Sequence, residues 1–402
     1  MPLPAAAPFL LACLFFAGVG ESAWAKVKSK ADDGPVCDKS AKSDDDDDEE
    51  EEEGVTFTAG AACVGLSGEF DAIGQAANVN EPRLARSSNS SSALTLKPDV
   101  RVEAVLPTQW GKLKTAFETE WSYVSSTGFE QSPTLDEATV AYLGLTVGYT
   151  ESLMNFWDSS DFQFTASAPN RSSYLVSYER ALTDELTAAI AVEAGPSTTR
   201  GADTWRLPQT PPYYTGRLRY EKDDWTLHAS AAFHQLETRA PPLLTGGIVT
   251  RNGWAASAGV TIPFEAVHED DSATVQATYA VDSSIFLGTQ SDISFLAAVV
   301  PTTGPTTGWS VVGSYVHNWS DKWKTNLFVS QLELSVDLSI AHPTVKTTRG
   351  GATLSYEIDD HWQIGTEIDY LYARFDFNGV FGIIKGGNLS GATGYAWLKW
   401  KF

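Results

Sequence analysis

Several features that mark other classes of protein are scarce or missing in this chain of 402 residues. Only 20% of the residues are charged, which is low for a soluble protein, and Lys and Arg number 28 against 51 for Asp and Glu. The formal charge of −23 excludes nucleic acid as the main partner, because phosphate contacts need clustered basic residues. Beyond the N-terminal region there is no apolar run of about 18 residues, so membrane-spanning helices are excluded for the mature chain.

The one long apolar segment lies at the N-terminus and predicts export. Residues 5–19 read AAAPFLLACLFFAGV, and residues 23–25 supply a small-x-small cleavage pattern. We therefore expect a signal peptide at residues 1–25. A loose lipobox before Cys13 leaves a lipid anchor at that cysteine as the alternative.

Cysteine is also scarce, and the mature chain keeps only Cys37 and Cys63. An even pair in an exported protein predicts one disulfide, with two free thiols as the alternative. The loop between them holds Asp44–Glu53, ten consecutive carboxylates that stay solvated because they repel one another. This run is either an inert disordered tract or a trap for divalent cations and an electrostatic funnel at a pore mouth. We expect residues 26–61 to form an acidic N-terminal segment tied by the disulfide.

From about residue 55 onward the hydrophobic pattern has a period of two, which indicates strands. Residues 309–319, 352–358 and 362–374 each place apolar and aromatic side chains on one face and mostly polar ones on the other. Trp309 and Trp319 bracket ten residue steps, which span roughly 23 Å in a strand tilted by about 45°. That length matches the ~25 Å apolar band between the aromatic girdles of an outer-membrane barrel.

Short polar turns alternate with long segments rich in Thr, Pro and Gly, which is the asymmetry of short periplasmic turns and long extracellular loops. The turns lie at 183–185, 222–224, 320–322 and 359–361, and the long segments at 196–212, 236–251, 285–308 and 375–390. We predict an all-β fold, a transmembrane antiparallel β-barrel over residues 62–402. Counting back from the C-terminus gives eleven strands down to residue 173 and five more between 62 and 150, sixteen in all.

The C-terminal strand carries the sharpest single signal. Apolar residues stand at every second position, and the last of them are Leu398, Trp400 and Phe402. Many outer-membrane barrels end on such an aromatic residue, which the barrel assembly machinery recognises. We expect these three residues to act as an assembly signal in the outer membrane of a Gram-negative bacterium.

Five stretches stand in a characteristic order: Cys37-Asp38 with Cys63 before VGLSGEFDA, a hairpin at 100–117, an Ala-Tyr strand and Gly-x-Thr-x-Gly-like step at 141–148, a Trp-centred hairpin at 213–235, and a strand pair at 308–328. In this order they resemble the alphaproteobacterial (Rhizobiales-type) porin family over nearly all of the mature chain. The resemblance implies a trimeric general diffusion porin that sits among outer-membrane lipids and passes small hydrophilic solutes and ions. Two departures make the pore less positive: the acidic run, and Tyr149 where the family tends to carry a base.

A barrel of this size leaves an aqueous lumen that side chains cannot fill. The segment 151–171 is plug-like, and porins of this architecture fold their third loop inward; the alternative is an ordinary surface loop. An inward fold places Glu151, Asp158 and Asp161 over the constriction. Charged side chains at membrane depth must face the lumen, so we expect an opposing basic wall unless these charges merely solvate the lumen. The candidate bases are Arg101, Lys114, Arg217 and Arg219.

The sequence therefore predicts a passive channel with weak cation selectivity, since the loop carboxylates and the acidic run outweigh the bases of the wall. A substrate-specific sugar channel is the alternative, because Trp and Tyr side chains can form a stacking track. A barrel enzyme is a third class, yet no Ser, His and acid motif and no metal-spaced cluster stands out around the six histidines. We expect no enzyme activity, no cofactor and no metal site.

Overall fold

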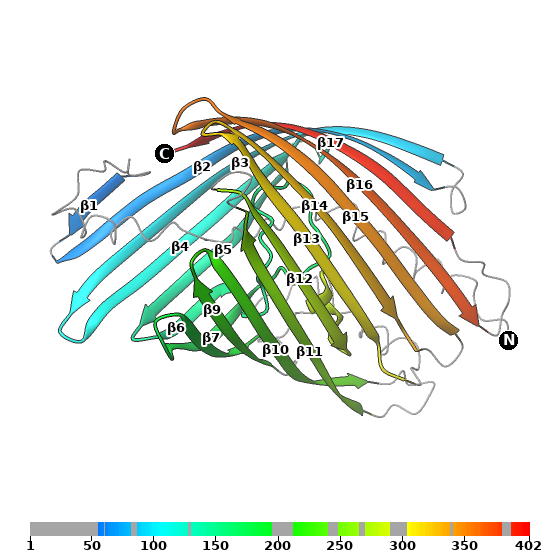
Figure 1. The fold of residues 1–402 in the computed structure, drawn as a ribbon, viewed down its shortest axis with the longest axis horizontal. Coiled ribbons are helices and arrows are strands. Elements are labelled where there is room, and N and C mark those ends of the chain that lie inside the picture. The colour runs from blue at the N-terminus through cyan, green and yellow to red at the C-terminus, as the bar shows by residue number, and fades with distance from the viewer. Residues whose placement is uncertain are drawn as a thin grey trace.

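Sixteen antiparallel strands, β2 to β17, close into one barrel in the computed structural model (Figure 1). The structure describes residues 55–59, 61–81, 87–127, 130–194, 212–239, 248–264, 270–289, 304–337, 341–379 and 387–402. Each strand pairs with its neighbour in the chain, and β17 pairs with β2 to complete the ring. The predicted all-β barrel and its sixteen strands are confirmed.

The bounds of the strands follow the predicted order along the chain. They are β2 (Ala62–Glu81), β3 (Ser87–Thr108), β4 (Gly111–Val124), β5 (Glu130–Tyr142), β6 (Leu145–Glu151), β7 (Ser172–Ala181), β8 (Leu186–Glu193), β9 (Tyr213–Lys222), β10 (Trp225–Arg239), β11 (Ile248–Pro263), β12 (Ser272–Val281), β13 (Thr307–Ser320), β14 (Trp323–Ser335), β15 (Ala341–Glu357), β16 (Trp362–Gly379) and β17 (Gly387–Lys401). Two 3-10 turns, η1 (Ser125–Thr127) and η2 (Ser284–Leu287), lie in connections. Within the described ranges, no helix is long and apolar enough to cross a membrane.

A further strand, β1 (Val55–Ala59), lies beside the start of β2 and close to the C-terminus (Figure 1). It pairs with β2 from Val55 opposite Leu66 onward, whereas the C-terminal Phe402 exchanges two backbone hydrogen bonds of 3.1 Å with Gly68. Strand β1 therefore continues the line of β17 along the edge of β2. The sequence analysis placed these residues in the N-terminal acidic segment and did not anticipate a strand there.

Side chains alternate between the outer face and the lumen, as a period of two predicts. On β14, Val329 is 59% exposed, whereas its neighbours Phe328 and Ser330 are buried. On β16, Ile368 is 66% exposed and Glu367 is buried beside it. The apolar face that the sequence analysis identified in each strand is thus the outer face, which meets the lipid.

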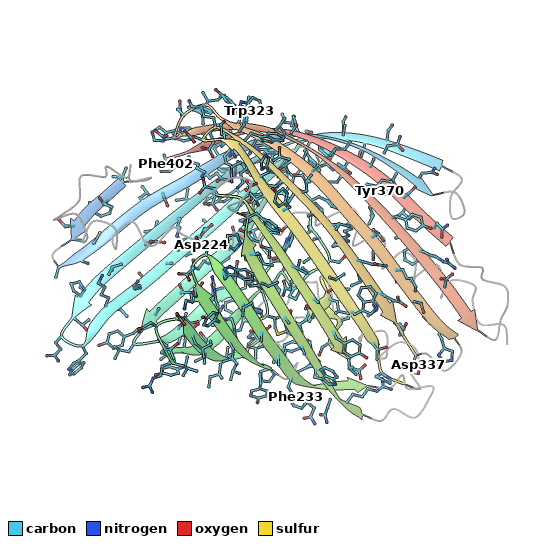
Figure 2. All side chains as sticks on the ribbon, viewed as in Figure 1. Asp224, Phe233, Trp323, Asp337, Tyr370 and Phe402 are labelled. Atoms are coloured by element: carbon cyan, nitrogen blue, oxygen red, sulfur yellow. The ribbon has the colours of Figure 1, made fainter. Side chains whose placement is uncertain are left out.

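Large aromatic side chains gather near both ends of this outer face. Figure 2 shows Phe233 and Tyr370 pointing away from the wall, with Trp323 and Phe402 toward one end of the barrel and Asp337 toward the other. The exposed aromatics beside the short turns include Trp110, Trp225, Trp319, Trp323, Trp362 and Trp400, and those toward the other end include Tyr174, Tyr214, Phe233, Trp254, Tyr279 and Tyr370. Two such belts are typical of the interfaces of a membrane barrel.

The connections differ in length between the two ends of the barrel. One end carries short turns, among them 143–144, 223–224 and 321–322, and the other carries the connections 152–171, 194–212 and 282–306. Asp223 and Asp224 both have positive φ, 47° and 64°, which is the backbone of the type I′ turn that suits the twist of a two-residue hairpin. We call the two ends the short-turn rim and the long-loop rim.

Candidate functional site

The segment 152–171, between β6 and β7, folds into the barrel, and we call it the constriction loop. Its root is fixed by Glu193 of β8, which is fully buried. The Glu193 carboxylate accepts hydrogen bonds from Ser152 Oγ at 3.0 Å, from the Leu153 amide at 3.2 Å and from Thr215 Oγ1 at 2.7 Å. A buried carboxylate that accepts this many hydrogen bonds fixes the position of the first residues of the loop.

From this root the constriction loop crosses to the far wall and hydrogen-bonds to four of its strands. The Trp157 amide donates to Gln276 of β12 at 2.9 Å, and the Trp157 indole donates to Ser314 of β13 at 2.9 Å. Further along, the Ser167 amide donates to Ser330 Oγ of β14 at 3.0 Å, and Arg349 of β15 donates to the carbonyl oxygen of Thr165 at 2.7 Å. The inward fold of the loop is confirmed.

Strand β16 is a fifth strand that anchors the constriction loop. The two carboxylate oxygens of Glu367 accept the backbone amides of Gln163 at 2.7 Å and of Phe164 at 3.0 Å. Glu367 is 4% exposed, so these bonds lie out of contact with bulk water. Two charge-assisted hydrogen bonds to adjacent amides fix the direction of the backbone at the middle of the loop.

Apolar packing seals the same interface. Trp157 and Phe162 of the constriction loop pack with Val312 and Phe328 of the wall, and the Phe162 and Phe328 ring centroids lie 4.7 Å apart, edge to face. Phe164 touches the wall clusters around Leu371 and Trp397 as well. The inner face of β12 to β17 therefore supports the loop through apolar contacts as well as through hydrogen bonds.

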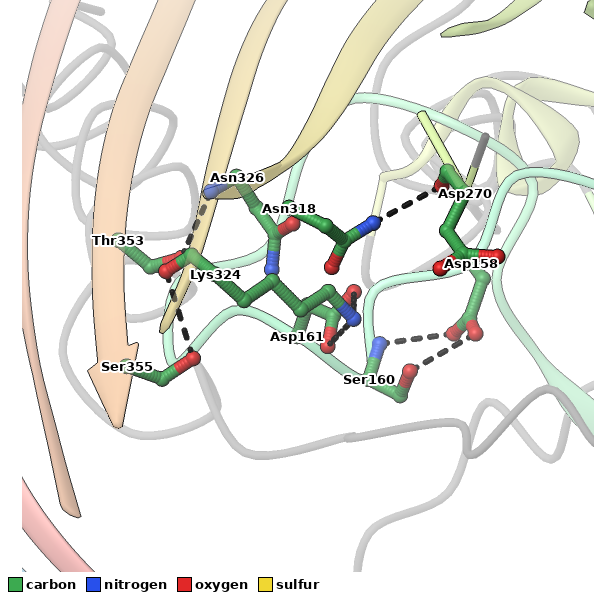
Figure 3. A network of polar contacts seen from close by, with 9 residues as sticks. All are labelled: Asp158, Ser160, Asp161, Asp270, Asn318, Lys324, Asn326, Thr353 and Ser355. Carbon is green, nitrogen blue, oxygen red and sulfur yellow. Dashed lines mark hydrogen bonds and ion pairs between the residues drawn. The ribbon is translucent and has the colours of Figure 1, made fainter. Parts of the chain in front are cut away.

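The three predicted loop carboxylates lie in different settings. Asp161 forms an ion pair of 3.0 Å with Lys324 of β14 (Figure 3). Asp158 instead accepts bonds from the amide and hydroxyl of Ser160, at 2.7 and 2.8 Å (Figure 3). Glu151 ends β6, and one of its carboxylate oxygens is buried with no hydrogen-bond partner among the described atoms.

The wall of β3 to β5 carries Arg101, and it is not the basic surface that we expected. Arg101 is ion-paired with Glu103, with Glu118 at 2.5 Å and with Glu137 at 2.7 Å. Its side chain is 13% exposed, so its charge acts mainly on these three carboxylates. Three negative charges around one positive charge leave this part of the wall acidic.

A β-bulge adds to that acidity. Glu118 of β4 pairs with Glu137 of β5, but the next residue, Thr119, pairs with Leu135, so Asp136 has no partner in the ladder. Carboxylate oxygens of Asp99, Glu118 and Asp136 all lie within 4.8 Å of one another. The bulge thus turns two consecutive acidic residues toward the lumen, which regular alternation does not do.

The other predicted bases are dispersed. Lys114 lies on β4 opposite Val105, near the short-turn rim. Arg217 of β9 is ion-paired with Glu179, and Arg219 is ion-paired with Glu221 at 2.6 Å. The structure therefore does not gather these bases around Arg101. Arg217 and Arg219 each have an acidic partner instead.

Some of the predicted features lie outside the described residues. These are the signal peptide, Cys13, Cys37 and the acidic run Asp44–Glu53. Cys63 is disulfide-bonded and lies at the start of β2, on the short-turn rim. Its pairing with Cys37 stays a prediction, as does the assembly signal, although Trp400 and Phe402 stack with ring centroids 5.2 Å apart.

The sequence analysis missed three charged residues that the site uses: Asp136, Lys324 and Glu367. Lys324 and Glu367 meet the loop only because residues 163 and 204 positions apart in the chain come together in the fold, and no local pattern reports this. The inward position of Asp136 could have been recognised from the sequence. Two adjacent carboxylates, Asp136 and Glu137, interrupt a strand whose neighbours alternate, and one of them must face lipid unless the strand bulges.

A closed barrel with two aromatic belts and a loop folded through its lumen is a channel protein of the porin class. A sequence model described as the porin subfamily matches residues 62–387, and the chain belongs to this family. It is accordingly a passive channel of the outer membrane of Gram-negative bacteria, and the family and the fold point to a channel rather than an enzyme.

Solved structures share the fold at low sequence identity. The outer-membrane channel DcaP of Acinetobacter baumannii is 16% identical with a TM-score of 0.64, over 86% of this chain and 99% of that chain. An anion-selective porin from Comamonas acidovorans is 14% identical with a TM-score of 0.50, over 85% and 100%. OprB of Pseudomonas putida is 11% identical with a TM-score of 0.52, over 84% and 94%. A search of curated proteins finds no match.

Proposed function

We propose that this porin is weakly cation-selective. The observation that carries the proposal is the charge of the β3 to β5 wall, which is separated from β17 in the ring by β2 alone. Acidic side chains on this wall are Asp99, Glu103, Glu118, Glu120, Asp136 and Glu137, and basic ones are Lys97, Arg101, Lys112 and Lys114. Field lines focus through a narrow passage with low-dielectric walls, so an excess of carboxylates there raises the local concentration of cations.

Charges in the constriction loop and in the N-terminal segment also favour selectivity for cations. Asp158 and Asp161 add carboxylates to the loop, and the run Asp44–Glu53 adds ten more to the chain before the barrel. The Comamonas porin of similar fold is anion-selective by its description, so this fold is compatible with either sign. Selectivity is then set by side chains such as these.

The test is the reversal potential of single channels in a gradient of potassium chloride. We expect a cation-selective potential that is largest at low salt, because the Debye length falls from ~30 Å at 0.01 M to ~3 Å at 1 M. Asp158→Asn with Asp161→Asn should reduce it, and deletion of residues 44–53 should reduce it less. Asp223→Asn with Asp224→Asn is the matched control, because Asn tolerates the positive φ of that turn.

An anion-selective potential in the unmodified protein overturns the proposal. An unchanged potential in the Asp158 and Asp161 double variant shows instead that the loop carboxylates do not line the narrowest point. A loss of selectivity in the Asp223 and Asp224 control assigns the effect to charge at the short-turn rim and not to the constriction.

The alternative of a sugar-specific channel has less support. Trp157, Trp397 and Tyr395 are the aromatic side chains that a sugar would stack on inside the barrel, and they are only 3%, 7% and 5% exposed. Trp157 packs against Val312 and Phe328 of the wall, and Tyr395 and Trp397 pack against Phe164 of the constriction loop. Flux of sugars of graded size into proteoliposomes separates the two functions: a general porin shows a smooth decline with size and no competition between sugars.

Further parts of the proposal rest on the family and on the sequence. We propose a homotrimer of the alphaproteobacterial (Rhizobiales-type) branch, exported with a cleaved signal peptide at residues 1–25. We propose no catalytic activity. Leu398, Trp400 and Phe402 at the end of β17 act as the signal for the assembly machinery, and replacing Phe402 by Ser should lower the yield of assembled barrel in the membrane.

A further inference from the structure

A second connection also enters the barrel. After β12, residues 282–287 are all buried, although they begin the connection 282–306 on the long-loop rim. Connections at the rim of a protein are usually exposed. Phe286 and Leu287 are fully buried, and they join Met154 of the constriction loop in one apolar cluster with Tyr213, Leu332 and Leu334 of the wall. We call residues 282–289 the support segment.

The start of the support segment is firmly attached to the barrel. Asp282 has a positive φ of 48°, and its side chain accepts the amide of Thr306 at 2.8 Å. Its carbonyl oxygen is bonded to His234 Nε2 at 2.7 Å, and its amide donates to the Thr306 carbonyl at 2.7 Å. A non-glycine residue held at positive φ by this many bonds marks a conformation that the surroundings enforce.

The support segment touches the constriction loop at its beginning and at its end. Met154 packs in the cluster with Phe286 and Leu287. Arg171, the last residue of the loop, lies over the Phe286 ring at 5.4 Å and over the Tyr213 ring at 5.1 Å. The Arg171 guanidinium also donates to the Ala194 carbonyl at 3.1 Å, so one side chain ties the loop to the segment and to the wall.

A third contact joins two backbones. Gly288 has a φ of 80°, and a Cβ atom placed there would overlap the amide of Ala168 in the returning arm of the loop. Only glycine allows the support segment to lie this close. The returning arm is therefore held between β13 and β14 on one side and the support segment on the other.

We infer that the support segment is a positioning element that holds the constriction loop and so sets the width of the channel. Phe286 and Gly288 act through the loop and do not face the solute themselves. The inference concerns the shape of the channel and not its charge, so it does not depend on the proposed cation selectivity. Its failure is distinguishable, because it predicts altered gating with an unchanged reversal potential.

The first experiment replaces Phe286 by Ala in the full-length protein. Truncation of a buried Phe removes the cluster contact and the surface on which Arg171 lies, so we expect the mean open dwell time in single-channel recordings to fall on the order of tenfold or more. The barrel should still assemble, because all strand pairs remain. Phe286→Leu should restore most of the dwell time, and Phe233→Ala, on the outer face, is the matched control.

The second experiment uses Gly288→Ala, which tests the inference even where Phe286→Ala fails to assemble. A Cβ at this position must displace the backbone of Ala168, so we expect a new conductance level or frequent closures. Gly313→Ala is its control, since the nearest atom to a Cβ there lies 3.8 Å away. Recordings of Gly288→Ala that match those of Gly313→Ala overturn the inference, as does a Phe286→Ala channel with normal dwell times.

Discussion

The inner surface of the barrel has two walls of opposite character. The wall of β3 to β5 presents Arg101 among carboxylates, and a bulge adds one more of them. The wall of β12 to β17 presents apolar side chains such as Phe328 beside single buried polar anchors such as Glu367, and the constriction loop lies on it. Both walls are built from strands with the same alternation. The difference shows that the alternation decides only which side chains face inward, while their chemistry decides which wall the loop covers.

This division makes the constriction asymmetric. The constriction loop gains its hold from apolar contact and a few buried hydrogen bonds, whereas the β3 to β5 wall is held together by ion pairs. Ion pairs in a lumen are screened by salt, but buried apolar contacts are not. We therefore expect the position of the loop to be insensitive to salt and the selectivity of the pore to be sensitive to it.

The largest effect is expected from Glu367→Ala, which removes the buried carboxylate that anchors the constriction loop to β16. The amides of Gln163 and Phe164 lose their acceptor, and each buried donor left unsatisfied costs about 1–3 kcal/mol. The loop should leave the wall, and single-channel recordings should show larger and noisier currents from a barrel of unchanged melting behaviour. Glu357→Ala, at the exposed end of β15, serves as the control. Currents like those of the unmodified channel would contradict the assigned anchor.

The next effect concerns the charged wall. Arg101→Gln removes the positive charge that faces Glu103, Glu118 and Glu137. We expect the reversal potential to shift toward cation selectivity. The current noise should stay low, because the contacts between the constriction loop and β12 to β17 are unchanged. Arg180→Gln, an exposed residue at the end of β7, is the matched change. A shift toward anions would mean that this wall does not face the conduction path.

A smaller effect should follow from Lys324→Met, which breaks the ion pair between β14 and the constriction loop. Lys324 holds Asp161, and the two side chains are 32% and 39% exposed, so the pair contributes at most about 1 kcal/mol. The loop should stay in place, and the freed carboxylate should raise cation selectivity slightly. Lys346→Met breaks a comparable pair with Glu333 and is the control. Gating noise in Lys324→Met alone would show that this ion pair, and not the apolar contacts, holds the loop.

The smallest effect on the channel is expected from Cys63→Ser, because the cysteine lies outside both walls. A non-reduced peptide map of the unmodified protein should join the peptides of Cys37 and Cys63, and alkylation of both as free thiols would reject this pairing. Conductance should not change in the variant. Any change at low salt should be a small loss of cation selectivity, because the acidic run is then no longer tied to Cys63.

Much of the barrel could be predicted because alternation reports directly on burial. Ile368 and Tyr370 were correctly placed on one face and Glu367 on the other from the sequence. Strand β5 (Glu130–Tyr142) is harder to delimit from the sequence, because the bulge at Asp136 breaks its alternation.

The site could be predicted less well, for a related reason. The sequence places Val312 on the inner face but does not show that a loop will cover it. The support segment was predicted only as part of a long loop, since its burial depends on Met154 and Tyr213, which are far away in the chain. Contacts of this kind form only when the barrel closes, so no short stretch of the sequence predicts them.

Strand β1 has a consequence for how the ring closes. It pairs with β2 through a tight local turn, so it can form as soon as residues 55–66 have been delivered, whereas β17 comes last in the chain. Strand β1 occupies the edge of β2 from Ala62 to Leu66, and β17 pairs with β2 only from Gly68 onward. A slip of β17 by one residue would turn Trp397 toward lipid and Leu398 toward water. The short N-terminal strand thus limits how far β17 can extend along β2, and so fixes the register of the β17–β2 pair that closes the barrel.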